Sequence, residues 1–393
     1  MKISKKDYSP LLFLAALWPG WLSVSFFMYL MFMTKHWTTP IPTFNSLYSY
    51  FTLTSYSSQD LLFNGLIIFA LIWVIFFAFK HYQMLIFNLI KYFEFRKTKA
   101  FQKIKEWNNE VNIMAIPLTF AMSINVLFIL GALFVPNLWN YVEYLFPFAI
   151  LWFLTIWFFG LKIFLDYFTR LLTTKSFDFV WNNSLWQMIS VFAFSMIWVW
   201  FAAPVAMSQN KITIAIALVF SIFFITITVF FSIIKIIIWF KSILRQGIKK
   251  EASPTLWIII PILTLIWISF VRQKHGLHEW FEIANQSWNL FVLTTVIISL
   301  QAIFWFIWYK VMKANKYFED YINWDKKSIW SFSLICPWVA LVVFWFFFLH
   351  LWFVKNWIVE KFTLPYFLLL LPLVYLQFKT IFTLFKLYKK FSK

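Results

Sequence analysis

The chain has 393 residues, of which 62% are hydrophobic and only 12% are charged, and its mean hydropathy is +0.76. A soluble domain is about half apolar and a quarter charged, and a chain of this length cannot bury so much apolar surface in its own core. These values exclude a soluble enzyme, a disordered protein and a disulfide scaffold. The single cysteine, Cys336, allows no internal disulfide.

Ten apolar stretches are long enough to cross a bilayer, which takes about 20 residues in an α-helix. They are continuously apolar and do not alternate with polar residues, which favours helices over β-barrel strands. The sequence therefore predicts an all-α integral membrane protein with a single ten-helix transmembrane domain over residues 1–393. In chain order, the predicted spans are 11–33, 61–79, 113–136, 146–168, 185–208, 212–235, 255–271, 290–309, 329–352 and 364–382. The first is too long for a cleavable signal sequence.

The net charge of +19 is concentrated in alternate connections between the spans. Of the 34 Lys and Arg, 28 lie in segments 1–10, 80–112, 162–184, 235–254, 310–328 and 379–393. The positive-inside rule therefore predicts cytoplasmic N- and C-termini. Because these cations are spread over six segments and form no single basic face, we expect no nucleic-acid partner. Segment 80–112 is predicted to be a cytoplasmic amphipathic connector on the inner leaflet.

Four of the odd-numbered spans carry prolines at similar depths. Pro19, Pro117, Pro261 and Pro337 occupy the first half of four odd spans, whereas Pro204 lies near the outer end of the fifth span. Proline removes a backbone hydrogen bond, and in lipid the freed carbonyl needs a partner in protein or water. We therefore expect helix kinks at Pro19, Pro117 and Pro261 and an inner ring of five odd helices, backed by five straighter outer helices. The competing interpretation is that proline is simply common in transmembrane helices.

Five inner helices around one axis would enclose a narrow pore. Hydroxyl and amide groups along it would donate hydrogen bonds to an anion without holding it tightly. The competing interpretation is that Ser and Thr bond their own helix backbone or mediate helix packing. The predicted pore-lining residues are Ser23, Thr119, Ser123, Asn125, Ser190, Thr264 and Ser333. The spans contain no ring of Asp or Glu, which argues against a cation channel.

In topology over nearly the whole chain, and in residues at 115–122 and 330–340, the sequence resembles the tellurite-resistance/dicarboxylate transporter family. This family includes bacterial TehA and the plant slow-type guard-cell anion channels. The resemblance implies five helical hairpins, a pore in each protomer lined by proline-kinked odd helices, and a homo-oligomer, commonly a trimer. It also implies a phenylalanine of span nine that plugs the pore beside a proline.

Cys336 stands at that place in this chain, directly before Pro337. We therefore expect the pore gate or constriction at Cys336 and Pro337, with Phe332 and Phe344 as alternative plugs. Around span nine the chain is also similar to the TsoY-type branch, which has selenocysteine members, and this similarity points to sulfur or selenium chemistry at Cys336. Alternatively, Cys336 is a small buried hydrophobe.

The leading hypothesis is an anion channel or facilitative transporter in the bacterial inner membrane. Its partners would be a small inorganic or organic anion and the lipid bilayer. We expect no enzymatic activity, no catalytic residue, no cofactor and no metal. One alternative is a transporter of a sulfur or selenium oxyanion that uses Cys336 as an essential pore contact. An alternative of another class is a membrane subunit of a redox or assembly complex, although the five histidines are not paired at mid-depth as bis-histidine haem requires.

Overall fold

The computed structural model describes residues 8–36, 38–53, 58–106, 108–174, 185–281 and 287–392, and within these ranges it is helical and contains no strand. The predicted all-α class is confirmed, and so is the presence of ten helices long and apolar enough to span a membrane. The spanning helices are α1 (Phe13–Met33), α3 (Ser58–Phe95), α5 (Ala115–Phe134), α6 (Val142–Thr174), α7 (Ile189–Met207), α8 (Lys211–Gln246), α9 (Ile259–Phe281), α10 (Ser287–Ala314), α11 (Ile335–Phe348) and α12 (Leu364–Ser392). Two short helices, α2 (Phe44–Leu53) and α4 (Lys99–Glu106), lie in the connections.

The spanning helices fall into two sets that differ in burial. In α1, α5, α7, α9 and α11, with their leading turns, between 61% and 94% of the most apolar stretch is buried inside the protein. In α3, α6, α8, α10 and α12 the share is only 17% to 33%, and the exposed side chains include Phe230, Ile303 and Phe382. Large apolar side chains on an exposed helix face suit contact with lipid.

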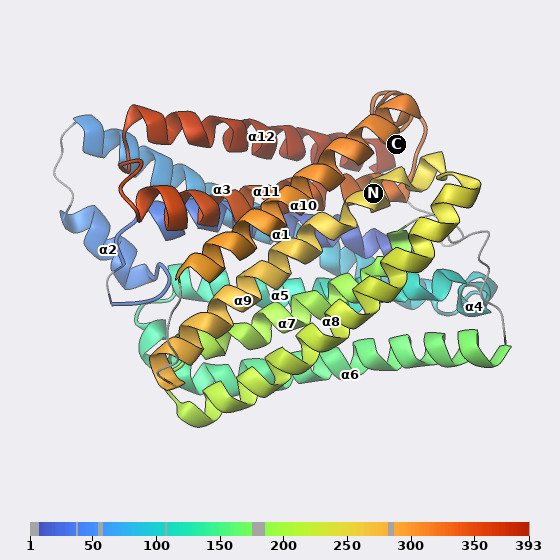
Figure 1. Ribbon diagram of the computed structural model, residues 1–393, viewed down its shortest axis with the longest axis horizontal. Helices are drawn as coiled ribbons and strands as arrows, with labels where there is room; N and C mark the ends of the chain where they lie inside the picture. The colour runs from blue at the N-terminus through green and yellow to red at the C-terminus, as the bar shows by residue number, and fades with distance from the viewer. Residues whose placement is uncertain are drawn as a thin grey trace.

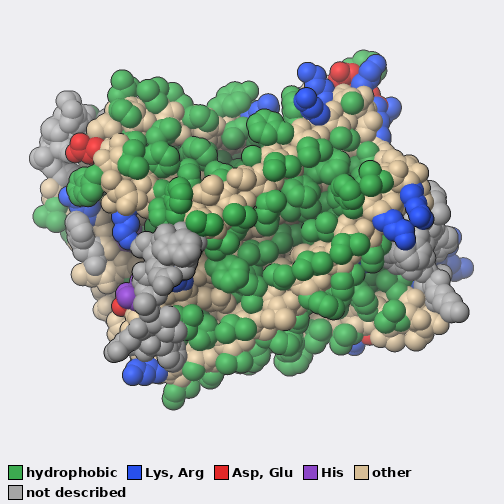
Figure 2. All heavy atoms as spheres, viewed as in Figure 1, with side chains coloured by type: hydrophobic (Ala, Val, Ile, Leu, Met, Phe, Trp, Pro, Cys, Tyr) green, Lys and Arg blue, Asp and Glu red, His purple; other side chains and the backbone are tan. Residues whose placement is uncertain are grey.

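The five buried helices contact one another in a closed circuit. α1 contacts α5, α5 contacts α7, α7 contacts α9, α9 contacts α11, and α11 contacts α1. Each of them also contacts the outer helix that follows it in the chain. Figure 1 shows the long helices running along the length of the molecule, with the two marked chain ends near the same end. On the face shown in Figure 2, hydrophobic side chains cover the middle and Lys and Arg gather towards the two ends.

A short 3-10 segment leads directly into every inner helix. These segments are η1 (Pro10–Leu12), η2 (Asn108–Met114), η4 (Leu185–Met188), η5 (Lys250–Ile258) and η7 (Ile329–Leu334). Pro117, Pro261 and Pro337 each take the third position of the α-helix that follows. The change of winding interrupts the regular helical hydrogen bonds at this place, so proline is tolerated here better than in mid-helix. Pro19 differs, because it is the seventh residue of α1.

The outer helices extend well beyond the predicted spans at the end that holds the termini. α3 has 38 residues and continues to Phe95, which takes in half of the predicted 80–112 connector. At 1.5 Å per residue it is about 57 Å long, against about 30 Å for the hydrocarbon core of a bilayer. The rest of the connector forms the amphipathic helix α4 and the 3-10 segment η2.

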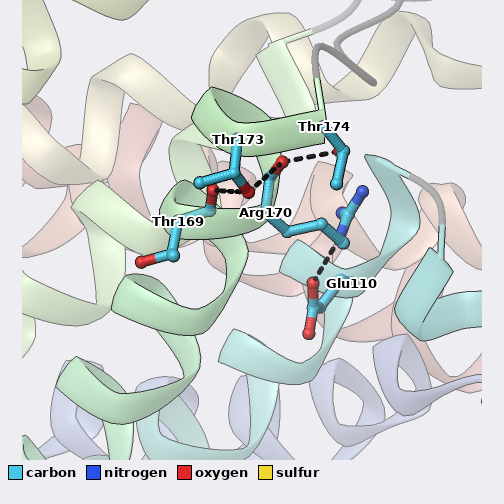
Figure 3. A network of polar contacts seen from close by, with 5 residues as sticks. All are labelled: Glu110, Thr169, Arg170, Thr173 and Thr174. Atoms are coloured by element: carbon cyan, nitrogen blue, oxygen red, sulfur yellow. Dashed lines mark hydrogen bonds and ion pairs between the residues drawn. The ribbon is translucent and has the colours of Figure 1, made fainter.

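At the same end, an ion pair fastens η2 to α6. Arg170 Nε of α6 donates to Glu110 Oε2 at 3.1 Å, and both side chains are largely shielded from solvent. Figure 3 shows the Arg170 side chain reaching towards Glu110, while the Thr174 hydroxyl donates to the Arg170 carbonyl oxygen near the end of α6. The guanidinium also lies 5.6 Å from the ring centre of Tyr167. This contact fixes the segment that leads into α5.

Candidate functional site

A small cavity lies among four of the five inner helices, inside the closed circuit. Its lining consists of Leu14 and Trp18 of α1, Ile189 and Phe192 of α7, Ile258 and Pro261 at the start of α9, and Ser333 and Cys336 at the start of α11. Its volume is about 10 Å³. That is room for about one water molecule. The interior of the ring is therefore closed at this level in this conformation.

Aromatic side chains from α1 and α7 close this space. Trp18 and Phe192 are almost fully buried, and Trp21 stacks on Phe192 with 6.4 Å between ring centres. The sequence analysis did not single out these residues. Trp18 directly precedes Pro19, as Cys336 directly precedes Pro337, and this shared position is a signal that could have identified Trp18 as well.

The two phenylalanines predicted as alternative plugs lie elsewhere. Phe332 packs on Phe391 of α12, with 5.4 Å between ring centres. Phe344 packs on Trp267 of α9 at 5.0 Å. Neither belongs to the lining of the axial cavity, because both side chains are turned towards neighbouring helices.

Cys336 is a free thiol, buried to 2% exposure, and it lines the cavity together with Ser333. The indole N–H of Trp18 is buried and has no acceptor among the described residues. An indole nitrogen can only donate, and a hydroxyl can donate or accept. The polar groups that line this cavity are thus able to donate hydrogen bonds, which suits a negatively charged or electron-rich guest.

Most of the predicted lining hydroxyls bond the protein backbone. Ser23 donates to a carbonyl of α3, and the others named here donate to carbonyls of their own chain segment, three or four residues earlier. The residues with such a bond are Ser23, Thr119, Ser123, Asn125, Ser190 and Thr264. The Asn125 contact is long at 3.4 Å. Of the predicted lining residues, Ser333 is the one that contributes to the axial cavity.

Polar side chains of the outer helices also turn inward. His81 of α3 lies 2.8 Å from the Ala16 carbonyl oxygen through Nδ1 and 2.8 Å from Ser123 Oγ through Nε2. Gln301 of α10 donates to Thr264 Oγ1 at 2.8 Å. A Cβ at Gly20 would clash with the Met122 side chain of α5 and would lie 2.9 Å from His81 Nδ1 of α3, so any larger residue there would force these side chains to shift. These contacts tie inner helices to outer ones and use up hydroxyl groups.

A cation faces the ring axis nearer the other end of α9. Arg272 follows Pro261 by 11 residues, which is close to three helical turns, so the two lie on one face of the helix. Thr264, on one flank of that face, contacts the Ala340 carbonyl of α11, and Gly276, on the other, packs against Val205 of α7. The face between these flanks, which carries Pro261 and Arg272, therefore points towards the axis.

Arg272 is half-buried as a residue, and its guanidinium donates from Nη1 to the Val199 carbonyl oxygen at 2.8 Å. Within the described part of the chain no carboxylate lies within ion-pair distance of it. The sequence analysis missed Arg272 because the predicted span ended at residue 271. In the structure α9 continues as a helix to Phe281.

No protein-family model, no curated protein and no solved structure matches the chain. The class of the protein therefore follows from its own structure. The ten apolar helices of the described residues, five of them largely buried and five largely exposed, define a multi-pass membrane protein of the transporter or channel type.

Proposed function

We propose that the protein is an anion channel or facilitative transporter whose permeation path follows the axis of the inner ring. The observation that carries this proposal is the Arg272 guanidinium, which faces the axis without a carboxylate partner among the described residues. A cation on the wall of a narrow, low-dielectric passage raises the local concentration of anions and repels cations.

The hydrogen-bond donors at the constriction also favour an anion. The Trp18 indole and the Ser333 hydroxyl lie on the cavity wall beside Cys336. We place the protein in a bacterial plasma membrane with both termini in the cytoplasm, as the basic inner connections favour. The ring of proline-bearing helices supports a distant relationship to the TehA family, and with it a trimer.

The test measures ion selectivity in liposomes. Purified protein is reconstituted, and chloride and potassium fluxes are followed under a salt gradient at both voltage polarities. Arg272→Gln is expected to lower chloride flux and chloride-over-potassium selectivity about tenfold, while Arg272→Lys keeps most of the selectivity. One charged hydrogen bond of about 1.5 kcal/mol corresponds to a factor of about ten. Lys355→Gln, which removes the same charge from an exposed outer connection, serves as the control.

Because the axial cavity is closed, the same series is repeated with Trp18→Leu, which widens the constriction. Absence of flux for any anion in both backgrounds would sink the proposal. That result would favour a subunit of a redox or assembly complex, which an optical spectrum for haem or flavin would then examine.

The position of Cys336 on the axial cavity favours a second candidate, transport of a sulfur or selenium oxyanion with the thiol as a contact. Cys336→Ala and Cys336→Ser are assayed with thiosulfate, selenite and chloride at matched protein abundance. Loss of thiosulfate or selenite flux with chloride flux kept within twofold supports the thiol contact. Equal, modest effects on all three ions leave the plain anion channel as the function.

A further inference from the structure

A groove of about 720 Å³ opens on the surface between the inner halves of α10 and α12, over the start of α11. It lies at the end of the molecule that carries the C-terminus of α12 (Figure 1). The polar part of its lining contains Lys313, Lys316, Lys379 and Lys386, with Glu319 as a carboxylate. The lining therefore carries an excess of positive charge.

The lysines are exposed and keep donor capacity for a ligand. Lys386 Nζ donates one hydrogen bond to Asn323 Oδ1 at 2.8 Å, and Lys379 Nζ lies 5.6 Å from the ring centre of Tyr375. An ammonium group has three donors, so both retain others. Lys313 and Lys316 stand together at the end of α10, opposite the two lysines of α12.

The rest of the groove is apolar. Trp338, Phe378 and Phe382 line it, and Leu334 and Ile335 form a buried floor. A groove that combines several lysines with aromatic rings, between two helices that face lipid, matches a molecule with an anionic head and long apolar chains. Basic pockets between transmembrane helices on the cytoplasmic side bind lipid head groups in this way.

The backbone at Lys316 supports a role for its side chain. Its φ is 51°, in the left-handed region just after α10 ends, and its N–H donates to the Lys313 carbonyl at 3.0 Å. Glycine is the residue that this conformation favours at a helix C-terminus. A lysine here adopts the less favourable conformation and places its ammonium group at the groove.

We propose that this groove binds an anionic glycerophospholipid of the inner leaflet, with the phosphate held by Lys313, Lys316 and Lys379. The acyl chains lie along Phe378 and Phe382. The lipid also contacts Trp338, two residues after Cys336, so an occupied groove braces the segment that carries Cys336 into the ring. The proposal requires a membrane location and does not depend on which ion permeates.

The test measures lipid retention by native mass spectrometry. Full-length protein in mild detergent is titrated with phosphatidylglycerol, cardiolipin or phosphatidylcholine of matched acyl chains. We expect the two anionic lipids to bind at least tenfold more tightly than phosphatidylcholine. The pair Lys313→Gln with Lys316→Gly should weaken anionic lipid binding about thirtyfold, since each lysine near an anionic lipid contributes a factor of about five.

Lys316→Gly relieves an unfavourable backbone conformation, so loss of binding in this variant does not arise from loss of folding. The control pair, Lys241→Gln with Arg245→Gln, removes two exposed charges from the inner end of α8, outside the groove. Equal binding of phosphatidylcholine, an equal loss in the control pair, or complete competition by inorganic phosphate would each overturn the proposal. Phosphate competition would indicate a site for a small anion.

Discussion

The Tyr388 hydroxyl of α12 donates a hydrogen bond of 2.5 Å to the Ala15 carbonyl oxygen of α1. Pro19 stands four residues after Ala15 and has no N–H, so Ala15 lacks its usual helical donor. An outer-ring phenol thus supplies the hydrogen bond that an inner-ring proline removes. In lipid, where water cannot supply this bond, the contact fixes α12 against the first half of α1.

Replacing Tyr388 with Phe should therefore lower the free energy of unfolding by about 1–3 kcal/mol, because it leaves a buried carbonyl without a partner. Thermal unfolding in detergent measures the change. Tyr375→Phe, at a site on α12 that is 63% exposed, should change little. In a Pro19→Ala background the restored N–H satisfies Ala15, so the cost of Tyr388→Phe should shrink. An undiminished cost there would contradict this explanation.

Trp18→Leu should increase anion leak through reconstituted protein, because the indole of Trp18 closes the axial cavity. Liposome flux at fixed protein abundance provides the measurement, and we expect an increase of at least fivefold. Trp152→Leu is the matched control, since that indole is 64% exposed on the outer helix α6. An unchanged or reduced leak in Trp18→Leu, with normal folding, would show that the closure lies elsewhere along the axis.

Removing one member of the Arg170–Glu110 pair should destabilise the protein by about 2 kcal/mol, since a shielded charge loses its charged hydrogen bond. Arg170→Met and Glu110→Gln are measured singly and together by chemical unfolding. The double variant should cost less than the sum of the two single variants, because no charge is then left without its partner. Additive costs would mean that the two side chains act independently. Lys91→Met, which breaks a pair with Glu94 that is more exposed to solvent than the Arg170–Glu110 pair, should have a smaller effect.

Acid should weaken the contact between η5 and the segment after α10. Lys326 at 2.7 Å and Lys250 at 2.9 Å from Asp320 Oδ2 lower the pKa of this carboxyl from 3.8 to about 2. A lowered pKa gives stability that is present above about pH 4 and is lost as the pH falls towards 2. Thermal unfolding midpoints between pH 6 and pH 2 should therefore fall more steeply for the wild type than for Asp320→Asn. Parallel pH profiles would show that the contact contributes no stability.

The class of the fold was predictable because it depends on bulk properties. Continuous apolar stretches of about 20 residues predict helices wherever they occur, and the matched prolines marked four of the five helices that the structure buries. Proline alone does not separate the two sets, because the outer helix α12 carries Pro372 in its interior. The ends of the helices were not predictable in the same way. α3 continues past its apolar stretch through Lys91, and α9 continues past its own through Arg272. Hydropathy did not predict these extensions, because it does not distinguish a polar helix from a loop.

The candidate site was less predictable, since side-chain direction depends on helix rotation. Thr119 and Ser123 carry hydroxyl groups of the kind that line pores, yet both donate to carbonyls of their own helix. Ser123 is also hydrogen-bonded to His81. Trp18 is one of many tryptophans in the chain and nothing in its residue type marks it, yet it lines the axial cavity. The sequence alone does not fix how each helix is rotated about its own axis, so it does not decide whether a given side chain faces the cavity or a neighbouring helix.

The 3-10 segment that precedes each inner helix allows that helix to move along and about its own axis. A 3-10 helix rises about 2.0 Å per residue and an α-helix about 1.5 Å, so rewinding the nine-residue η5 as an α-helix would shorten it by about 4.5 Å. The same rewinding would rotate α9 about its long axis. Such a screw motion would carry Pro261 and Arg272 away from their present positions and would break the hydrogen bond that joins Thr264 to Gln301 of α10.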